Sequence, residues 1–398
     1  MPHETTAQGT RAPVFWRRQI DPQHLGLVIT ILAALGSTYV VMCVKTLVAG
    51  EGMYGFADFH ALWVSGVLAH DGRPLVNYDE AALHAEQVAR GIDAHHYNPF
   101  PYPPTLLMLL APLGGLSLPW AFMAFMGGSA ALYLAAMTWG RARDWRWWVG
   151  ALAAPAGGIA LVSGQSGFLS GALAVGGLRL ATRRPVLAGV LFGLLAFKPQ
   201  LGLLIPVVLA AAGLWRVVVS AAATVLACVA LSSLAFGWET WPAWVHQMAA
   251  YAGGYDVALH LMPTIFAGAR QVGAPEWAAV SVQAVATLIV AVVVWRAARG
   301  GLTEQAAALT LVGTFLATPH ALNYDMPMMT AAIVGFVVAR SDANQPMRLG
   351  ETLVAALAFL WPFAILALHA KLACLYWAPV ALLFALLARP DAWRRASP

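Results

Sequence analysis

The polar segment at residues 51–104 reads EGMYGFADFHALWVSGVLAHDGRPLVNYDEAALHAEQVARGIDAHHYNPFPYPP and interrupts a chain that is otherwise strongly apolar. Hydrophobic residues make up 60% of the 398 residues, charged residues make up 10%, and mean hydropathy is +0.70. Soluble domains have about 45–50% apolar and about 25% charged residues. This chain has too few charges for a solvated surface, so we expect an all-α polytopic membrane protein.

The apolar stretches on either side of this polar segment set the number of crossings. A crossing helix needs about 20 mostly apolar residues. The sequence predicts about twelve, near residues 24–46, 118–140, 147–163, 166–181, 185–197, 199–214, 217–236, 277–297, 303–318, 323–339, 351–369 and 372–388. We expect one membrane domain over 24–388, with cytoplasmic segments at 1–23 and 389–398. Segment 104–117 is short and broken by Pro112 and two glycines, so we expect a re-entrant or interfacial helix there.

Lysine and arginine set the orientation, because cytoplasmic loops are enriched in them. With a cytoplasmic N-terminus, the outer side keeps only six basic residues, namely Lys45, Arg73, Arg90, Lys198, Arg270 and Lys371. The other seventeen lie at cytoplasmic ends. We therefore expect a multi-pass protein of the cell (inner) membrane whose 51–103 loop faces the periplasm or exterior. The net charge of +5 follows from this topology and does not indicate a nucleic-acid partner.

Five polar segments then share the outer face. They are residues 51–103, SGQSG at 163–167, FKPQ at 197–200, residues 237–276, and TPHALNYD at 318–325. Loops that converge on one face of a rigid scaffold are typical of a binding or active site.

The 51–103 loop is predicted to contain two amphipathic helices, at about 58–70 and 79–90, separated by a turn. Phe59 and Trp63 suit a helix that lies in the lipid headgroup layer. Asp58 begins the first helix just beyond a membrane span, where desolvation should raise its pKa. The structural alternative is a cap or first-turn acid that complements the helix dipole.

The order of short motifs resembles one known family. ADFHALW (57–63) is followed by GRPLVNYD (72–79), the YPP motif at Tyr102, the Gly-Gln pair at Gln165, the Lys-Pro pair at Lys198, and Pro-His at His320 with Asp325 nearby. Each motif is short, and the ordered set over about 51–325 resembles glycosyltransferase family 87. The resemblance implies the GT-C membrane fold and transfer of a hexose, commonly mannose, from a polyprenyl-phosphate donor.

The family pattern implies roles for individual residues. Asp58 would be the general base on a hydroxyl of a glycan or lipid-linked acceptor, on the non-cytoplasmic face and with inversion. The implied donor-site residues are Lys198 and His320 at the phosphate, Gln165 and Asp325 at the sugar, and Tyr102 beside them. Structural alternatives stay open: Lys198 could snorkel to the interface, Gln165 could be an inter-helix amide, and His320 and Asp325 could cap helices.

No cofactor is expected, because the sequence has no glycine-rich phosphate loop and no evident cluster of outer-face acids for a metal. Membrane lipids, the sugar donor and the acceptor are the expected partners. The alternative function is a transporter or flippase of lipid-linked sugars. Such a protein should show inverted repeats with broken spans at matching positions, and the sequence shows no such repeat.

Overall fold

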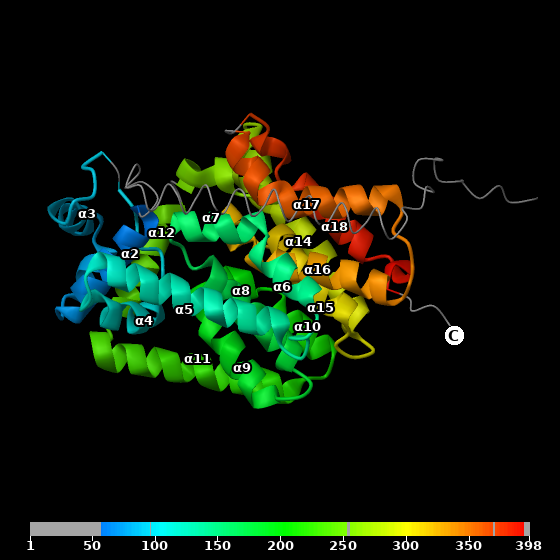
Figure 1. Ribbon diagram of the computed structural model, residues 1–398. Coiled ribbons are helices and arrows are strands. Elements are labelled where there is room, and N and C mark those ends of the chain that lie inside the picture. Colours follow the sequence, from blue (N-terminus) through cyan, green and yellow to red (C-terminus); the bar gives the residue numbers. More distant parts are fainter. Residues whose placement is uncertain (1–56, 96, 253–254, 369–370, 394–398) are drawn as a thin grey trace, which may run out of the picture.

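The computed structural model describes residues 57–95, 97–252, 255–368 and 371–393, so the predicted span 24–46 and both terminal segments lie largely or wholly outside the described residues. Within these ranges every regular element is a helix (Figure 1). The predicted all-helical class is therefore confirmed for the described part of the chain.

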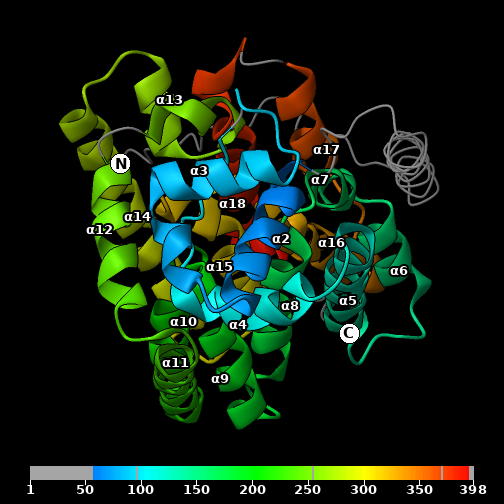
Figure 2. The same cartoon turned by 90° about the vertical axis from the view of Figure 1, so that its left-hand side faces the viewer.

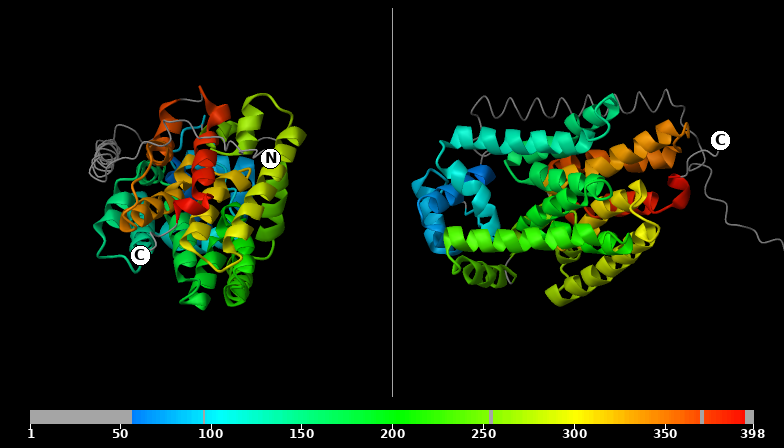
Figure 3. Two further views of the ribbon diagram at one scale, coloured as in Figure 1. Left: turned by 90° about the vertical axis from the view of Figure 1, so that its right-hand side faces the viewer. Right: turned by 90° about the horizontal axis from the view of Figure 1, so that it is seen from below.

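Four of the described helices are long and apolar enough to cross a membrane: α5 (Leu118–Thr138), α11 (Trp215–Phe236), α14 (Glu276–Ala298) and α17 (Leu349–Ala367). Only 11% of the most apolar 18-residue stretch of α11 is buried inside the protein, and only 22% of that of α14. Helices that expose apolar side chains so extensively need lipid around them. α5 and α11 run lengthwise along the bundle (Figures 1 and 3).

Exposed tryptophans mark both ends of three of these helices. The pairs are Trp120 and Trp139 for α5, Trp215 and Trp238 for α11, and Trp277 and Trp295 for α14. At 1.5 Å per residue the members of each pair are about 27–35 Å apart along the chain. This matches the roughly 30 Å of a bilayer core with aromatic belts at its two interfaces.

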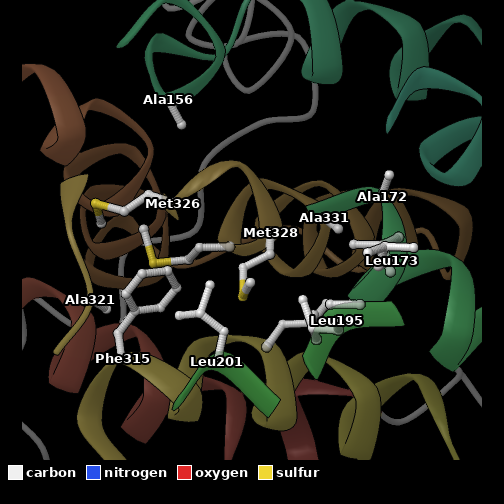
Figure 4. Close-up of a cluster of buried hydrophobic side chains, with 14 of the residues drawn as sticks. Ala156, Ala172, Leu173, Leu195, Leu201, Phe315, Ala321, Met326, Met328 and Ala331 are labelled. Atoms are coloured by element: carbon white, nitrogen blue, oxygen red, sulfur yellow. The ribbon is translucent and has the colours of Figure 1, made fainter. Parts of the chain in front are cut away.

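The other apolar helices are shorter, and the prediction of twelve crossings stays a prediction. They are α4 (Pro104–Gly114), α8 (Gly167–Leu180), α9 (Pro185–Leu194) with η4 (Leu195–Phe197), η5 (Pro199–Gly202) with α10 (Ile205–Ala211), α15 (Glu304–Ala317), α16 (Pro327–Asp342), and η8 (Ala373–Leu375) with α18 (Ala378–Leu387). α8, η4, α15 and α16 meet in the middle of the bundle, where Leu173, Leu195, Phe315 and Met328 pack together (Figure 4).

One predicted span is wrong as a single helix. Residues 147–163 form two helices, α6 (Trp145–Leu152) and α7 (Pro155–Ser163). Pro155 has no N–H to donate, and its ring forces the preceding residue out of the helical region. Ala154 accordingly has φ −68° and ψ 125°.

The 51–103 loop contains the two predicted helices, α2 (Ala57–His70) and α3 (Glu80–Ala89), with η3 (Pro74–Tyr78) between them. Asp79 caps α3 by accepting a hydrogen bond from the Ala82 N–H at 3.0 Å. The placement of Phe59 in the headgroup layer is wrong. Its side chain is 0% exposed and packs against Phe122 and Phe125 of α5, with ring centroids 5.4 Å apart in both cases.

α2 packs against α4 at very short range. A Cβ added to Gly66 would lie 2.4 Å from the carbonyl oxygen of Leu110, and one added to Gly114 would lie 2.4 Å from the backbone of Gly66. α4 has eleven residues, about 16 Å of helix, which is half the thickness of a bilayer core. That this segment does not cross by itself stays a prediction, and the short helix favours it.

The outer-loop elements gather at one end of the bundle, where α2, α3 and α4 lie beside α12 (Thr240–Ala252) and α13 (Ile265–Gln271) (Figure 2). Two hydrogen bonds join these segments: Trp244 Nε1 to the Pro101 carbonyl at 3.2 Å, and Thr264 Oγ1 to the Pro319 carbonyl at 3.0 Å. The loops that share an end in the sequence prediction therefore touch in the structure.

Candidate active site

The SGQSG turn at 163–167 lies between two acid-bearing segments, and its glycines make this possible. Gly164 has φ +63°, and a Cβ there would lie 2.5 Å from the Cβ of Phe59. A Cβ on Gly167 would lie 1.8 Å from the carbonyl oxygen of Tyr324, in η7 (Asn323–Asp325). The turn thus contacts the neighbour of Asp58 on one side and the neighbour of Asp325 on the other. Side chains at either glycine would force these segments apart.

A chain of two hydrogen bonds runs through this turn to Asp58. The Tyr102 hydroxyl donates to Gln165 Oε1 at 3.1 Å, and Gln165 Nε2 donates to Asp58 Oδ2 at 3.3 Å. An ionised Asp58 carboxylate can only accept, so it fixes the Gln165 amide with Nε2 towards Asp58 and Oε1 towards the tyrosine hydroxyl. α2, the segment before α4, and the 163–167 turn are therefore tied together at the Asp58 carboxylate.

Asp58 lies in the first turn of α2 and is partly exposed. Desolvation raises its pKa above the usual 3.8, while the hydrogen bond from Gln165 and the nearby Lys198 charge act in the opposite direction. A carboxylate with a raised pKa is a stronger proton acceptor than an ordinary surface aspartate. Tyr102 is buried, which raises its pKa, so it stays protonated and keeps donating to Gln165.

Lys198 and Asp325 form a buried ion pair next to this chain. Lys198 Nζ lies 2.7 Å from Asp325 Oδ1, and the two residues are 3% and 2% exposed. Asp325 Oδ2 accepts a hydrogen bond from the Leu322 N–H at 3.2 Å, which holds the carboxylate in place. Lys198 sits between η4 and η5, where Pro199 ends one helical segment and begins the next. Snorkelling of Lys198 to the interface is therefore excluded.

Two tyrosine rings flank the Lys198 ammonium. Nζ lies 4.8 Å from the ring centroid of Tyr324 and 5.8 Å from that of Tyr102. Aromatic faces attract a cation at these distances. Tyr324 was not predicted from the sequence, although its position directly before Asp325 was the available signal.

His320 lies in the segment between α15 and η7, close enough to Asp325 and Lys198 to feel both charges. Burial lowers the pKa of its imidazole to about 4, and the Lys198 charge acts in the same direction while Asp325 opposes it. The imidazole is therefore neutral at neutral pH. His320 can hydrogen-bond a phosphate there, but it adds no fixed positive charge.

All six residues predicted for the site are described. They come from four of the five polar segments that the sequence placed on the outer face, and the structure brings them together. Asp58, Gln165 and Tyr102 form one hydrogen-bonded group, and Lys198 and Asp325 form the other, with His320 beside it. Lys198 also links the groups, because its charge acts on Asp58 and its ammonium lies over Tyr102. A partly exposed carboxylate thus lies near a buried ammonium group.

One of three comparisons with known proteins identifies a family for this chain. The family model described as Glycosyltransferase family 87 matches residues 100–319, which include Tyr102, Gln165 and Lys198 and end one residue before His320. Asp58 and Asp325 lie outside the matched region. No curated protein and no solved structure matches the chain. Because the match covers more than half of the chain, the protein belongs to glycosyltransferase family 87 and is a membrane glycosyltransferase.

Proposed function

We propose that the protein transfers a hexose, mannose by its family resemblance, from a polyprenyl-phosphate donor to a hydroxyl of a glycan or lipid-linked acceptor. The observation that carries the proposal is the Asp58 carboxylate, held at 3.3 Å by Gln165 within range of the Lys198 charge. A general base and a positive group for a leaving phosphate are the two elements that such a displacement needs.

In the proposed reaction the acceptor oxygen forms a bond to the anomeric carbon while Asp58 takes its proton. The bond from the anomeric carbon to the phosphate oxygen breaks, and the electron pair leaves with the polyprenyl phosphate. Attack comes from the face opposite the phosphate, so the anomeric configuration inverts. The phosphate gains a negative charge as it leaves, and a nearby cation stabilises that charge.

Lys198 is the proposed cation. An ammonium group has three N–H donors, and within the described residues Lys198 gives one hydrogen bond, to Asp325. Two donors remain for a phosphate oxygen. Asp325 is proposed to hold the ammonium and to bind the sugar, and neutral His320 to donate a hydrogen bond to the phosphate.

Gln165 is proposed to orient the base and to contact the sugar. One N–H of its amide donates to Asp58, and the second is available in the same plane for a sugar hydroxyl. Tyr102 holds the other end of the amide through its own hydrogen bond to Oε1.

We also propose that this site opens on the periplasmic or extracellular face of the inner membrane. The support is the charge asymmetry. The helices α5, α8 and α14 begin at the end of the bundle that holds the site, and Arg141, Arg179 and Arg296 lie at or just after their far ends. At the end that holds the site, Lys198 is one of few basic residues. Cytoplasmic ends are enriched in basic residues. A reporter fused at residue 95 should read non-cytoplasmic, and a cytoplasmic signal there would overturn this orientation.

The test is sugar transfer in proteoliposomes with a radiolabelled polyprenyl-phosphate hexose and an acceptor. Asp58→Asn keeps the shape of the side chain but cannot take the proton, and should lower the rate about 10²–10⁴-fold. Asp71→Asn is the matched control, because it makes the same change at an exposed turn of the same loop. Unchanged transfer by Asp58→Asn would refute the base assignment. Donor movement across the bilayer without transfer would favour a flippase.

A further inference from the structure

A cavity of about 470 Å³ lies at the end of the bundle opposite the candidate active site. It is formed where α5 and α8 end and α15 begins, together with α16 and the segment after α18. α8 begins beside Gln165 and carries Arg179 in its last turn. At 1.5 Å per residue these two residues are about 21 Å apart along the helix, so the cavity is separate from the catalytic site.

The cavity lining is rich in positive charge. Arg141, Arg179 and Arg183 line it, and Glu304 is the one acid among its lining residues in the described part of the chain. Arg141 forms an ion pair with Glu304, which leaves an excess of two positive charges. An adjoining cavity contains Asp144 and Asp342, but both of these acids pair with Arg146.

Two of the arginines are held over the same tryptophan. The guanidinium carbons of Arg141 and Arg179 lie 4.6 Å and 4.3 Å from the ring centroid of Trp147. Arg179 also donates to the backbone carbonyls of Met137 and Trp139, where α5 ends. These contacts fix the two guanidinium groups in place before any ligand arrives.

The indole of Trp147 is enclosed in the cavity wall. It is 2% exposed and lines the cavity, yet its Nε1–H has no hydrogen-bond partner among the described residues. Buried polar groups in native proteins nearly always have a partner. Because this N–H is closed off from the cavity, the contribution of Trp147 to the site is the ring on which the two arginines stack.

The rest of the cavity wall is apolar. It includes Val175, Leu178, Leu311, Ala331 and Trp393. A ligand that fits both parts has an anionic head and a hydrocarbon portion. Basic pockets between membrane helices bind anionic lipid headgroups in this way, and arginine binds phosphate oxygens bidentately.

We propose that this arginine cavity binds a phosphate group, and that the phosphate belongs to an anionic phospholipid whose acyl chains lie along the apolar wall. Arg141 and Arg183 contact the phosphate at the open side, and Arg179 contacts it from within. A free phosphate shares the same headgroup chemistry and differs only in lacking the acyl chains.

The test measures lipid binding to the purified full-length protein, independently of sugar transfer. Phosphatidylglycerol is titrated against phosphatidylcholine in detergent, with native mass spectrometry as the readout, and inorganic phosphate is added in a separate arm. The double variant Arg141→Gln/Arg183→Gln should bind phosphatidylglycerol about a hundredfold more weakly, about tenfold for each charge-assisted contact. Glu304→Gln should bind it more tightly, because it removes the acid that lines the cavity.

Arg216→Gln is the matched control, since it removes one exposed positive charge at the same end of the bundle and does not line the cavity. Loss of binding in the double variant with normal binding in Arg216→Gln supports the proposal. Displacement of phosphatidylglycerol by millimolar inorganic phosphate also supports the phosphate site and assigns recognition to the headgroup alone. Equal binding of the two lipids with no phosphate binding, or equal losses in the double variant and Arg216→Gln, would overturn it. Sugar transfer by the double variant checks that it has folded.

Discussion

Lys198→Met removes the cation that pairs with Asp325 and leaves a carboxylate that is 2% exposed without its partner. At the observed 2.7 Å and an effective dielectric constant of about 20, the Coulomb attraction of the pair is about 6 kcal/mol. Desolvation of both ions offsets most of this attraction, so the intact pair adds little net stability. Breaking it is different, because the remaining buried charge costs about 3–5 kcal/mol.

The double variant Lys198→Met/Asp325→Asn removes both charges and should recover most of that loss. Asparagine keeps an oxygen that can accept the hydrogen bond that the Leu322 N–H now gives to Asp325. Each single variant, Lys198→Met or Asp325→Asn, should lower the free energy of unfolding by about 3–5 kcal/mol. The double variant should lose about 1–2 kcal/mol, which gives a coupling of several kcal/mol.

The assay is unfolding in mixed micelles with rising denaturant, followed by tryptophan fluorescence, with sugar transfer measured on the same samples. Lys371→Met is the control, because Lys371 is exposed at the same end of the protein, and it should change stability by less than about 0.5 kcal/mol. The stable double variant should still lack transfer activity, since the proposed phosphate contact is gone. Additive losses in the double variant would refute the buried pair, and wild-type transfer by it would refute the role of Lys198.

Three further predictions test the site. Burial raises the pKa of Asp58, and the carboxylate accepts a proton only in its ionised form. The transfer rate should therefore rise with pH and reach half of its maximum above pH 3.8. The pH–rate profile of Asp58→Asn should lack this rise. Gly167→Ala should destabilise the protein by about 1–3 kcal/mol or more, because the added Cβ would collide with the Tyr324 carbonyl. Gly127→Ala is the control: its Cβ would lie in open space on α5, so it should be neutral or stabilising by up to about 1 kcal/mol. Thermal unfolding of both variants measures the difference. Transfer measured before and after dialysis against EDTA should not change, and a loss restored by a divalent metal would contradict the metal-free mechanism.

Much of the site could be predicted because its residues stand in short motifs at the ends of apolar runs. Asp58, Gln165, Lys198 and Asp325 are polar groups at positions where the chain leaves or breaks a hydrophobic stretch. Polar side chains there need partners or ligands. The order of the apolar runs and the uneven distribution of lysine and arginine predicted that these residues lie on the same face of the membrane.

The pairing of these residues could not be predicted from the sequence. Lys198 and Asp325 are 127 residues apart, and the family resemblance implied separate roles for them, at the phosphate and at the sugar. The neutral state of His320 depends on how deeply its loop is buried, which local sequence does not specify. The burial of Phe59 could not be predicted either. Its place on the apolar face of an amphipathic helix suggested contact with lipid, but its ring packs against α5.

The sequence by itself determined that this chain is an all-helical membrane protein, because its apolar composition excludes a solvated surface and its short motifs fall in a family-specific order. The break before Pro155, which the prediction of a single span over 147–163 missed, also has a local cause, because proline restricts the residue before it. Only the tertiary structure decided which carboxylate faces Gln165, which acid neutralises Lys198, and where the arginine cavity lies. Those properties depend on distances between segments that are far apart in the chain, and on burial that packing alone creates.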